Sequence, residues 1–395
     1  MGSVVGTVAS GWEGVRDAFE SAQAQDEGAA QLAIYIDGQC VVDLCAGSDP
    51  IRGRPVDVDS LVVLMSVTKG LAALCTHLLA QRGLLDIEAP VAEYWPEFGV
   101  NGKAGIRVSD LLAHRAGLPG FEPERRFSEL LDWDASVDAL ARMRPMWAPK
   151  TAYEYHTVTY GVLVGEVVRR VAGQSLGAFF ASEVARPLGL DLWIGLPTSE
   201  EPRVLPTFRT IEYPTRAELV EQLAGFGLRE SDAIVKSYVD RTMSLADMVP
   251  VLNSAAGRQA ELPAVNAVGN ARSLAKTYAA MIGSVDGVRL LTRESVDRLK
   301  SPQTDDLTLP VPLDRVPEPH PLRFGLGFEL PRSAVPQFGP ASFGHAGAGG
   351  RLAYADPDHG LAVGYTCTNM CWDGVVGPDA RWVPWTDELH RVIGA

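Results

Sequence analysis

A serine and a lysine three residues apart stand out in the apolar stretch "DSLVVLMSVTKGLAALCTHLLAQRGLL", residues 59–85. Its periodicity predicts a helix from about Ser66 to Arg82, closed by Gly83. Positions i and i+3 share a helix face, with Cβ atoms about 5–6 Å apart, so Ser66 and Lys69 can touch. The serine also falls at the helix N-terminus, where free N–H groups and the helix dipole favour developing negative charge.

This pair has the parts of an activated nucleophile. A serine hydroxyl attacks poorly until a neighbouring group takes its proton. A lysine in apolar surroundings loses part of its preference for the charged form, so Lys69 can act as the base for Ser66 or assist it. Ser-x-x-Lys is a short pattern, however. The structural alternative is an N-cap serine beside a lysine that extends from a helix towards water.

A second segment with chemical potential is "TAYEYHTVTYGVLVGEVV", residues 151–168. Three tyrosines lie close together, and Tyr155 opens the tripeptide Tyr-His-Thr that ends at Thr157. A phenol near a lysine can have its pKa lowered from about 10 and then relay protons. Aromatic packing at the start of a helix is the alternative, and it suits Tyr153 and Tyr160 better than Tyr155.

A third segment, "FGHAGAGGRLAYADP" at residues 343–357, places His345 and Gly347 before a run of small residues that leads into an expected strand. Glycines let a backbone approach closely and expose N–H groups to a ligand. A tight turn before a β-hairpin is the alternative for this segment.

Taken together and in this order, the three segments resemble the serine β-lactamase and penicillin-binding-protein superfamily. The likeness is greatest to class C β-lactamases and the related family VIII carboxylesterases. Two further segments, "VSDLLAHRAGLPG" and "GNARSLAKTYAAMI", resemble the family's Leu-Leu-x-His-x-x-Gly-Leu segment and its late helix. The resemblance covers most of the chain. It implies that Ser66 is the acylated nucleophile, Lys69 its proton acceptor and Tyr155 the partner base.

The resemblance also implies a substrate site. The backbone N–H groups of Ser66 and Ala348 would form the oxyanion hole, with His345, Gly347 and Thr157 beside it. Two departures matter: Thr157 stands where the family usually has Asn, and His-Ala-Gly at 345–347 stands where β-lactamases have Lys-Thr-Gly. A largely neutral histidine holds a carboxylate poorly, so we expect esters to be better substrates than β-lactams.

These residues predict a serine hydrolase that cleaves carboxylic esters through an acyl-enzyme on Ser66, with Lys69 and Tyr155 as base. The alternative is an acyltransferase that passes the acyl group to an amine or alcohol in a biosynthetic pathway. A β-lactamase and an inactive binding module are less favoured. The expected partner is a small-molecule ester, or an acyl donor with its acceptor, and no cofactor, metal or oligomeric state is predicted. The sequence has no Gly-x-Ser-x-Gly elbow, which excludes the α/β-hydrolase route.

The elements that must position these residues follow an α+β pattern. "QLAIYIDGQCVVDLCAG" reads as a hairpin, "RFGLGFEL" and "RLAYADPDHGLAVGYTCTN" as late strands, and the middle as helical. We expect a β-lactamase-like fold with one antiparallel sheet, built from both termini and flanked by helices, in residues 1–106 and 266–395. Residues 107–265 would be an inserted, mainly helical domain, with 197–262 as a cap over the site or as a peripheral excursion.

Bulk composition narrows the partners. The 395 residues are 46% hydrophobic and 21% charged, with a net charge of −14. An acidic surface repels phosphate backbones and anionic headgroups, so we expect neither nucleic-acid nor membrane binding. No apolar stretch reaches the length of a membrane span, and the N-terminus lacks a secretory pattern. Five cysteines are too few and too irregular for a disulfide framework; they predict reduced core thiols and a cytoplasmic location.

Overall fold

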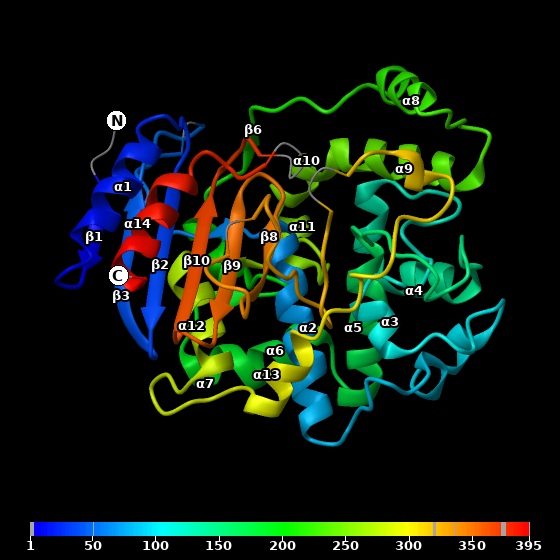
Figure 1. The fold of residues 1–395 in the computed structure, drawn as a ribbon, viewed down its shortest axis with the longest axis horizontal. Coiled ribbons are helices and arrows are strands. Elements are labelled where there is room, and N and C mark those ends of the chain that lie inside the picture. Colours follow the sequence, from blue (N-terminus) through cyan, green and yellow to red (C-terminus); the bar gives the residue numbers. More distant parts are fainter. Residues whose placement is uncertain (1–3, 50, 319–320, 336, 373–376, 395) are drawn as a thin grey trace.

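A six-stranded antiparallel sheet, drawn from both ends of the chain, is the centre of the fold (Figure 1). The computed structural model describes residues 4–49, 51–318, 321–335, 337–372 and 377–394. The strand order is β1-β3-β2-β10-β9-β8, so early and late strands meet where β2 pairs with β10. The expected α+β, β-lactamase-like architecture is confirmed. The strands are β1 (Val5–Val8), β2 (Ala30–Ile36), β3 (Gln39–Ala46), β8 (Phe343–Gly347), β9 (Arg351–Asp356) and β10 (Leu361–Cys367).

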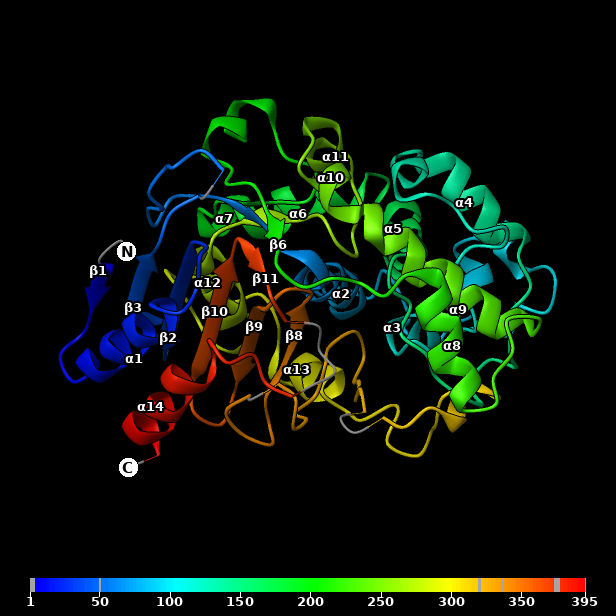
Figure 2. The same ribbon diagram turned by 90° about the horizontal axis from the view of Figure 1, so that it is seen from above.

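Helices cover both faces of this sheet. The amphipathic helices α1 (Glu13–Gln23) and α14 (Val383–Ile393) pack together on one face, and α12 (Ala271–Ile282) lies on the other (Figures 1 and 2). A glycine in β10 lets α12 approach closely, because a Cβ on Gly364 would lie 2.4 Å from the carbonyl oxygen of Ala271. The helix α2 (Thr68–Gln81) is buried along most of its length, beyond β8.

The middle of the chain is mainly helical, as expected. Its apolar core is continuous with the core beneath the sheet, so the domain boundaries expected at 106/107 and 265/266 stay a prediction. The helices are α3 (Val108–Leu112), α4 (Trp133–Arg142), α5 (Thr159–Ala172), α6 (Leu176–Phe180), α7 (Arg186–Leu188), α8 (Arg216–Gly225), α9 (Ala233–Ser244), α10 (Met248–Leu252), α11 (Ala255–Gln259) and, after α12, α13 (Arg293–Leu299). Short strands are β4 (Val62–Val63), β5 (Leu192–Trp193), β6 (Phe208–Arg209), β7 (Val268–Gly269) and β11 (Asn369–Met370).

The segment 197–262 forms its own small layer. Figures 1 and 2 show α8 and α9 at the end of the molecule away from α1 and both termini. These helices share a separate apolar cluster that also includes Leu313 from a later loop. We therefore describe α8 and α9 as the outer helix pair; the role of the whole segment as a cap stays a prediction.

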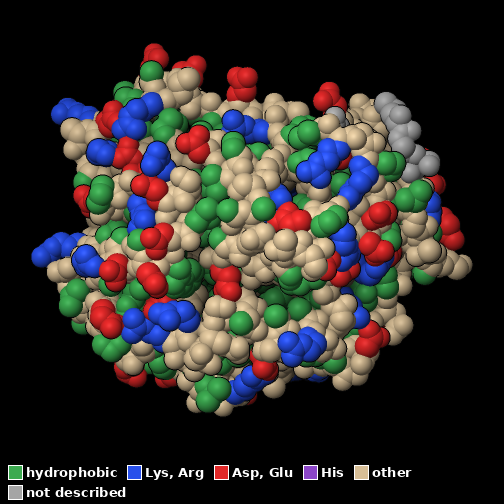
Figure 3. All heavy atoms as spheres, turned by 180° about the vertical axis from the view of Figure 1, so that it is seen from behind, with side chains coloured by type: hydrophobic (Ala, Val, Ile, Leu, Met, Phe, Trp, Pro, Cys, Tyr) green, Lys and Arg blue, Asp and Glu red, His purple; other side chains and the backbone are tan. Residues whose placement is uncertain are grey.

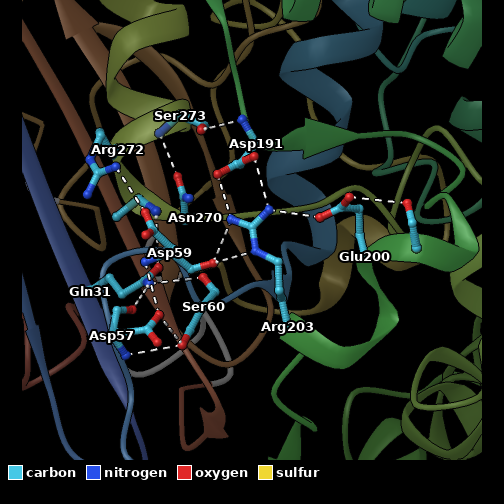
Figure 4. A network of polar contacts seen from close by, with 12 residues as sticks. Gln31, Asp57, Asp59, Ser60, Asp191, Glu200, Arg203, Asn270, Arg272 and Ser273 are labelled. Atoms are coloured by element: carbon cyan, nitrogen blue, oxygen red, sulfur yellow. Dashed lines mark hydrogen bonds and ion pairs between the residues drawn. The ribbon is translucent and has the colours of Figure 1, made fainter.

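An arginine network ties the start of this segment to the strand that leads towards Ser66 (Figure 4). Arg203 pairs with Asp191 at 2.6 Å and donates to the carbonyl oxygen of Asp59 at 2.8 and 3.1 Å. The carboxylate of Asp59 in turn pairs with Arg272 of α12 at 3.2 Å. Because Asp59 lies just before β4, three parts of the chain hold the approach to Ser66 in place.

One expected strand is wrong. The segment 323–330, "RFGLGFEL", forms only isolated bridges, between Phe324 and Glu329 and between Glu329 and Gly344. The residues between them turn, and Gly327 has φ +92°, a left-handed conformation that suits glycine. Alternating apolar residues predicted a strand because the pattern does not register the bend at the glycines.

The five cysteines are free, but they are not all in the core. Cys45, Cys75 and Cys367 are buried, whereas Cys40 and Cys371 are exposed. The expectation of core thiols is thus wrong for two of them. The cytoplasmic location expected from these thiols stays a prediction.

No helix within the described ranges combines the length and the apolar character needed to cross a bilayer. Basic and acidic side chains are interspersed on the face of the molecule in Figure 3. Among the side chains drawn there, no continuous basic surface is visible that would suit a phosphate backbone.

Candidate active site

Ser66 lies on a sharp turn between β4 and α2. It belongs to a 3-10 turn, Met65–Val67, and α2 begins at Thr68, two residues later than expected. Met65 has φ +51°, a strained conformation for a residue with a side chain. The Thr68 hydroxyl supports it by donating to the carbonyl oxygen of Met65 at 2.6 Å while accepting from the Ala267 N–H at 3.0 Å. Ser66 is therefore held at one position, 8% exposed.

Lys69 is completely buried beside Ser66. Its Nζ lies 3.2 Å from Ser66 Oγ and within hydrogen-bond distance of two main-chain carbonyl oxygens, 2.8 Å from Thr157 and 3.0 Å from Ala264. Burial holds the pKa of Lys69 well below its usual value, although the nearby Glu329 acts in the opposite direction. A neutral amine has two N–H groups and one lone pair. With both carbonyls as acceptors, the lone pair is left for the Ser66 hydroxyl.

Tyr155 completes the expected trio. The Lys69 Nζ lies 4.6 Å from the centroid of its ring. Burial raises the pKa of Tyr155 well above 10, Glu329 raises it further, and a hydrogen bond with Ser66 acts the other way. The expected lowering of this phenol's pKa is therefore wrong, and Tyr155 keeps its proton at neutral pH. Tyr153 does not join the trio, since its hydroxyl donates to the carbonyl oxygen of Leu322.

Two buried histidines support the segment that carries Tyr155. The His156 N–H donates to His114 Nδ1 at 3.0 Å, and the Leu118 N–H donates to His156 Nε2 at 3.1 Å. The rings of His114 and Tyr155 lie 4.9 Å apart. Burial lowers the pKa of both histidines, to about 3 for His156, so neither is charged at neutral pH. Their contacts are those of structural residues.

The two segments that are expected to form the oxyanion hole meet at a glycine. A Cβ on Gly347 would lie 2.7 Å from the carbonyl oxygen of Leu64 and 3.3 Å from the Cβ of Met65, so only glycine lets β8 approach the turn at Ser66 this closely. Ala348 follows directly and is partly exposed. Within the described part of the chain, neither the Ser66 N–H nor the Ala348 N–H donates to a protein acceptor. Both are free to bind an oxyanion.

Arg351, at the start of β9, contacts both segments of the expected oxyanion hole, a role that the sequence did not predict. It is fully buried; its Nε donates to the carbonyl oxygen of Val63 at 3.3 Å and its Nη1 to that of Ala348 at 3.1 Å. Its Nη2 donates to the Thr207 hydroxyl at 3.1 Å. No ion pair to Arg351 is present among the described residues. One guanidinium thus joins the strand that leads to Ser66 with the turn that carries Ala348.

His345 and a buried carboxylate, Glu329, lie next to the trio. His345 is 1% exposed; its Nδ1 lies 2.6 Å from the Ala346 carbonyl oxygen and 3.5 Å from Glu329 Oε1. Burial lowers the pKa of His345 to about 4 despite the carboxylate, so the imidazole is neutral at pH 7. Glu329 was also missed, because it stood in the segment that the pattern predicted as a plain strand.

The structure brings together all the residues that the sequence assigned to the site. Thr157 differs from the expectation in the group that it contributes. Thr157 takes part through its backbone carbonyl, which holds Lys69, in addition to any contact of its partly exposed side chain. Across the described residues, no group of three or more His, Cys, Asp or Glu side chains is placed to hold a metal ion.

Comparisons with known proteins identify the family of this chain. The chain matches the family model described as Beta-lactamase over residues 15–382. It is 36% identical over 346 residues to the esterase/beta-lactamase LipL of Mycobacterium tuberculosis, which covers 85% of this chain and 76% of that protein. The chain therefore belongs to the beta-lactamase family.

Two solved structures resemble the whole chain. One is a family VIII carboxylesterase, with a TM-score of 0.81, 34% identity and coverage of 98% of this chain and 99% of that one. The other is EstA from Arthrobacter nitroguajacolicus Rue61a, with a TM-score of 0.81, 30% identity and 98% coverage of both chains. The expectation of an enzyme of the carboxylesterase type within this family is confirmed.

Replacing the arginine behind the oxyanion hole should slow catalysis more than it weakens binding. Arg351→Met keeps much of the side-chain volume but removes all three donors, so the Ser66 and Ala348 N–H groups lose their fixed separation. We expect kcat on a neutral ester to fall by roughly 10², the scale of losing one oxyanion donor, with a much smaller change in KM. Arg351→Lys should recover part of the rate.

The matched control is Arg82→Met, which removes an exposed, ion-paired arginine far from the turn. Its rate should be unchanged. A loss of kcat in Arg351→Met that is explained by unfolded protein, measured by circular dichroism at the assay temperature, would contradict the positioning role. So would a loss confined to KM.

The pH dependence of the reaction should report Lys69. A protonated Lys69 cannot accept the Ser66 proton, so kcat/KM for a neutral ester should fall as the pH drops through the pKa of this lysine. Because burial lowers that pKa, the acid limb should lie well below pH 10.5. His345, with a pKa of about 4, should not cause the limb. The pH–rate profile of His345→Gln should keep the same midpoint, and a shifted midpoint would contradict the assignment to Lys69.

Proposed function

We propose that this protein hydrolyses small carboxylic esters through a covalent acyl-enzyme on Ser66. The observation that carries the proposal is the contact between a deeply buried Lys69 amine and the Ser66 hydroxyl at 3.2 Å. Both N–H groups of the neutral amine have carbonyl acceptors, so its lone pair is directed to the nucleophile. The esterase names of the similar proteins support the same substrate class.

In the first half of the reaction, Ser66 Oγ attacks the ester carbonyl carbon and its proton passes to Lys69. The negative charge that develops on the carbonyl oxygen is bound by the N–H groups of Ser66 and Ala348. When the C–O bond breaks, the leaving alkoxide takes the phenolic proton of Tyr155, and Lys69 returns its proton to Tyr155. The products of this half are the free alcohol and an acyl-Ser66 ester.

The second half reverses the proton path. A water molecule attacks the acyl carbonyl as its proton passes to the Tyr155–Lys69 pair. The tetrahedral intermediate is again bound by the two N–H groups, and the C–O bond to Ser66 then breaks. Ser66 recovers its proton and the carboxylic acid leaves. The net reaction is ester plus water to alcohol plus acid, with no other reactant.

Neutral substrates fit this site better than anionic ones. His345, at the position of the family's lysine, is buried and neutral, and Glu329 lies beside it. Arg351 and Arg272, which otherwise offer a positive charge to a substrate carboxylate, are already engaged. Arg351 binds backbone carbonyls, and Arg272 pairs with Asp43 at 2.6 Å on the sheet.

Transfer of the acyl group to an alcohol or amine is the second candidate. The observation that favours it is the low exposure of Ser66, because a site that excludes water lets another acceptor compete for the acyl-enzyme. Both candidates share the first half-reaction and differ only in the acceptor.

The decisive experiment follows the acyl group by mass spectrometry. A panel of p-nitrophenyl esters is incubated with the enzyme, with and without added alcohols and amines. We expect one acyl adduct, on Ser66, and free acid as the product. A new ester or amide as the main product would favour transfer instead. An adduct that persists in Ser66→Ala, or turnover by that variant at the wild-type rate, would reject the proposed nucleophile.

The neutral His-Ala-Gly segment at 345–347 predicts which substrates are cleaved fastest. Wild-type enzyme should cleave p-nitrophenyl acetate well and penicillins or cephalosporins poorly, since nothing in the motif fixes their carboxylate. His345→Lys should improve cephalosporin acylation more than ester cleavage, because an ammonium beside the site attracts an anion. Pre-steady-state acylation rates for both substrates measure this. A wild-type kcat/KM for a β-lactam that matches the best ester would show that another group holds the carboxylate.

A further inference from the structure

A cavity of about 830 Å³ lies between the loop at 121–126 and the outer helix pair. The loop contributes Phe121 and Glu124 to its wall, and α9 contributes Lys236, Ser237 and Asp240. Its volume is within the range of small-molecule sites. None of the residues that line it belongs to the trio at Ser66 or to the oxyanion hole.

Two buried polar atoms that have no partner among the described residues belong to the wall of this cavity: Glu124 Oε2 and Ser237 Oγ. A third such atom, Arg241 Nη1, belongs to a residue one turn further along α9. Ser237 is 8% exposed and Arg241 5% exposed. The Glu124 and Ser237 atoms meet at Gly120, where a Cβ would lie 3.4 Å from Glu124 Oε2 and 3.3 Å from Ser237 Oγ. The stem of Arg241 passes the same point, with its Cβ at 3.9 Å. Leaving a buried donor or acceptor unpaired costs stability, so such a cluster favours a ligand that forms hydrogen bonds with it.

The cluster is joined to the active site through one short segment. The other terminal nitrogen of Arg241 pairs with the buried carboxylate of Glu154, the residue directly before Tyr155. At the far end of the same segment, the Thr157 carbonyl holds Lys69. Residues 154–157 therefore face the cavity cluster at one end and the catalytic lysine at the other.

The three atoms select the chemistry of the ligand. The Arg241 nitrogen only donates, the Glu124 oxygen accepts, and the Ser237 hydroxyl does both. An anion would be opposed by Glu124 and an ammonium by Arg241. Four basic side chains belong to the cavity wall, and each has a partner. Arg216 and Lys236 pair with Asp240, Arg126 pairs with Glu129, and Arg125 donates to the Glu129 carbonyl oxygen. A neutral group that donates and accepts, which means a hydroxyl or a primary amide, satisfies both the Glu124 oxygen and the Ser237 hydroxyl.

Resting on the proposed ester hydrolysis, we propose that this cavity binds a hydroxyl or amide group at the far end of the ester substrate. Burial also raises the pKa of Glu124 to about 7, which reduces the charge that an ester has to face there. The group is carried either by the acyl chain or by the alcohol chain, and the experiment has one arm for each.

In the first arm, p-nitrophenyl esters of ω-hydroxy acids of increasing length are each compared with the unsubstituted ester. In the second arm, acetate esters of diols are compared with those of the matching simple alcohols. We expect kcat/KM to favour the hydroxylated ester in one arm at one chain length. Ser237→Ala should reduce that preference roughly tenfold, because one buried hydrogen-bonding group is left without its partner. The rate on p-nitrophenyl acetate should not change.

Two further variants, one inside the cavity and one outside it, separate a loss of ligand contact from a general loss of stability. Gly120→Ala places a methyl group beside Ser237 Oγ and Glu124 Oε2 and should reduce the same preference. Ser231→Ala removes an exposed hydroxyl just before α9, outside the cavity, and should leave it intact. The absence of a preference in both arms, or a preference unchanged in Ser237→Ala and Gly120→Ala, would overturn the proposal while ester hydrolysis stands.

If no ester is turned over at all, the proposed function fails. A binding measurement then tests whether the cavity is a ligand site. Saturation-transfer NMR with Ser66→Ala protein and a hydroxylated ester then measures binding directly. Binding that is lost in the Ser66→Ala, Ser237→Ala double variant supports the cavity site. No binding, or binding that the second substitution leaves unchanged, overturns it.

Discussion

The burial of Lys69 is the constraint on which the rest of the site depends. A charged ammonium without water is costly, so burial favours the neutral amine, and two backbone carbonyls accept hydrogen bonds from it. Its acceptors, the carbonyls of Thr157 and Ala264, come from the helical middle of the chain, whereas Ser66 and Lys69 precede it. The base therefore exists only when the helical part is packed on the sheet part. Folding and activation of the nucleophile are one event.

Buried side chains also hold the backbone carbonyls of the turn that follows Gly347. Arg351 binds the Ala348 carbonyl, Arg381 donates to that of Gly349 at 2.6 Å, and the Trp382 indole donates to that of Gly350 at 2.9 Å. Three consecutive carbonyls are thereby engaged by buried side chains. In a low-dielectric interior these bonds are strong, so the turn is rigid before any substrate arrives.

Short sequence patterns correctly predicted those features that depend only on residues close together in the chain. The hairpin around Asp37 and Gly38 is present because both residues accept positive φ, at 48° and 79°. The three-residue spacing brought Ser66 and Lys69 together for a similar reason. Arg351 was not predictable, because its acceptor at Val63 lies 288 residues away and its position reads as an ordinary strand residue. Only the packed chain shows that this arginine faces the oxyanion turn.

The effect of burial on charge explains why one environment provides both an acid and a base. Burial disfavours whichever form of a group is charged, so it lowers the pKa of the Lys69 amine and raises that of the Tyr155 phenol. Burial thus favours an amine that can take a proton, and at neutral pH the phenol still has one to give. Glu329 acts against the first shift and adds to the second. The division of roles at Ser66 thus follows from exclusion of water together with one buried carboxylate, and it requires no special property of either side chain.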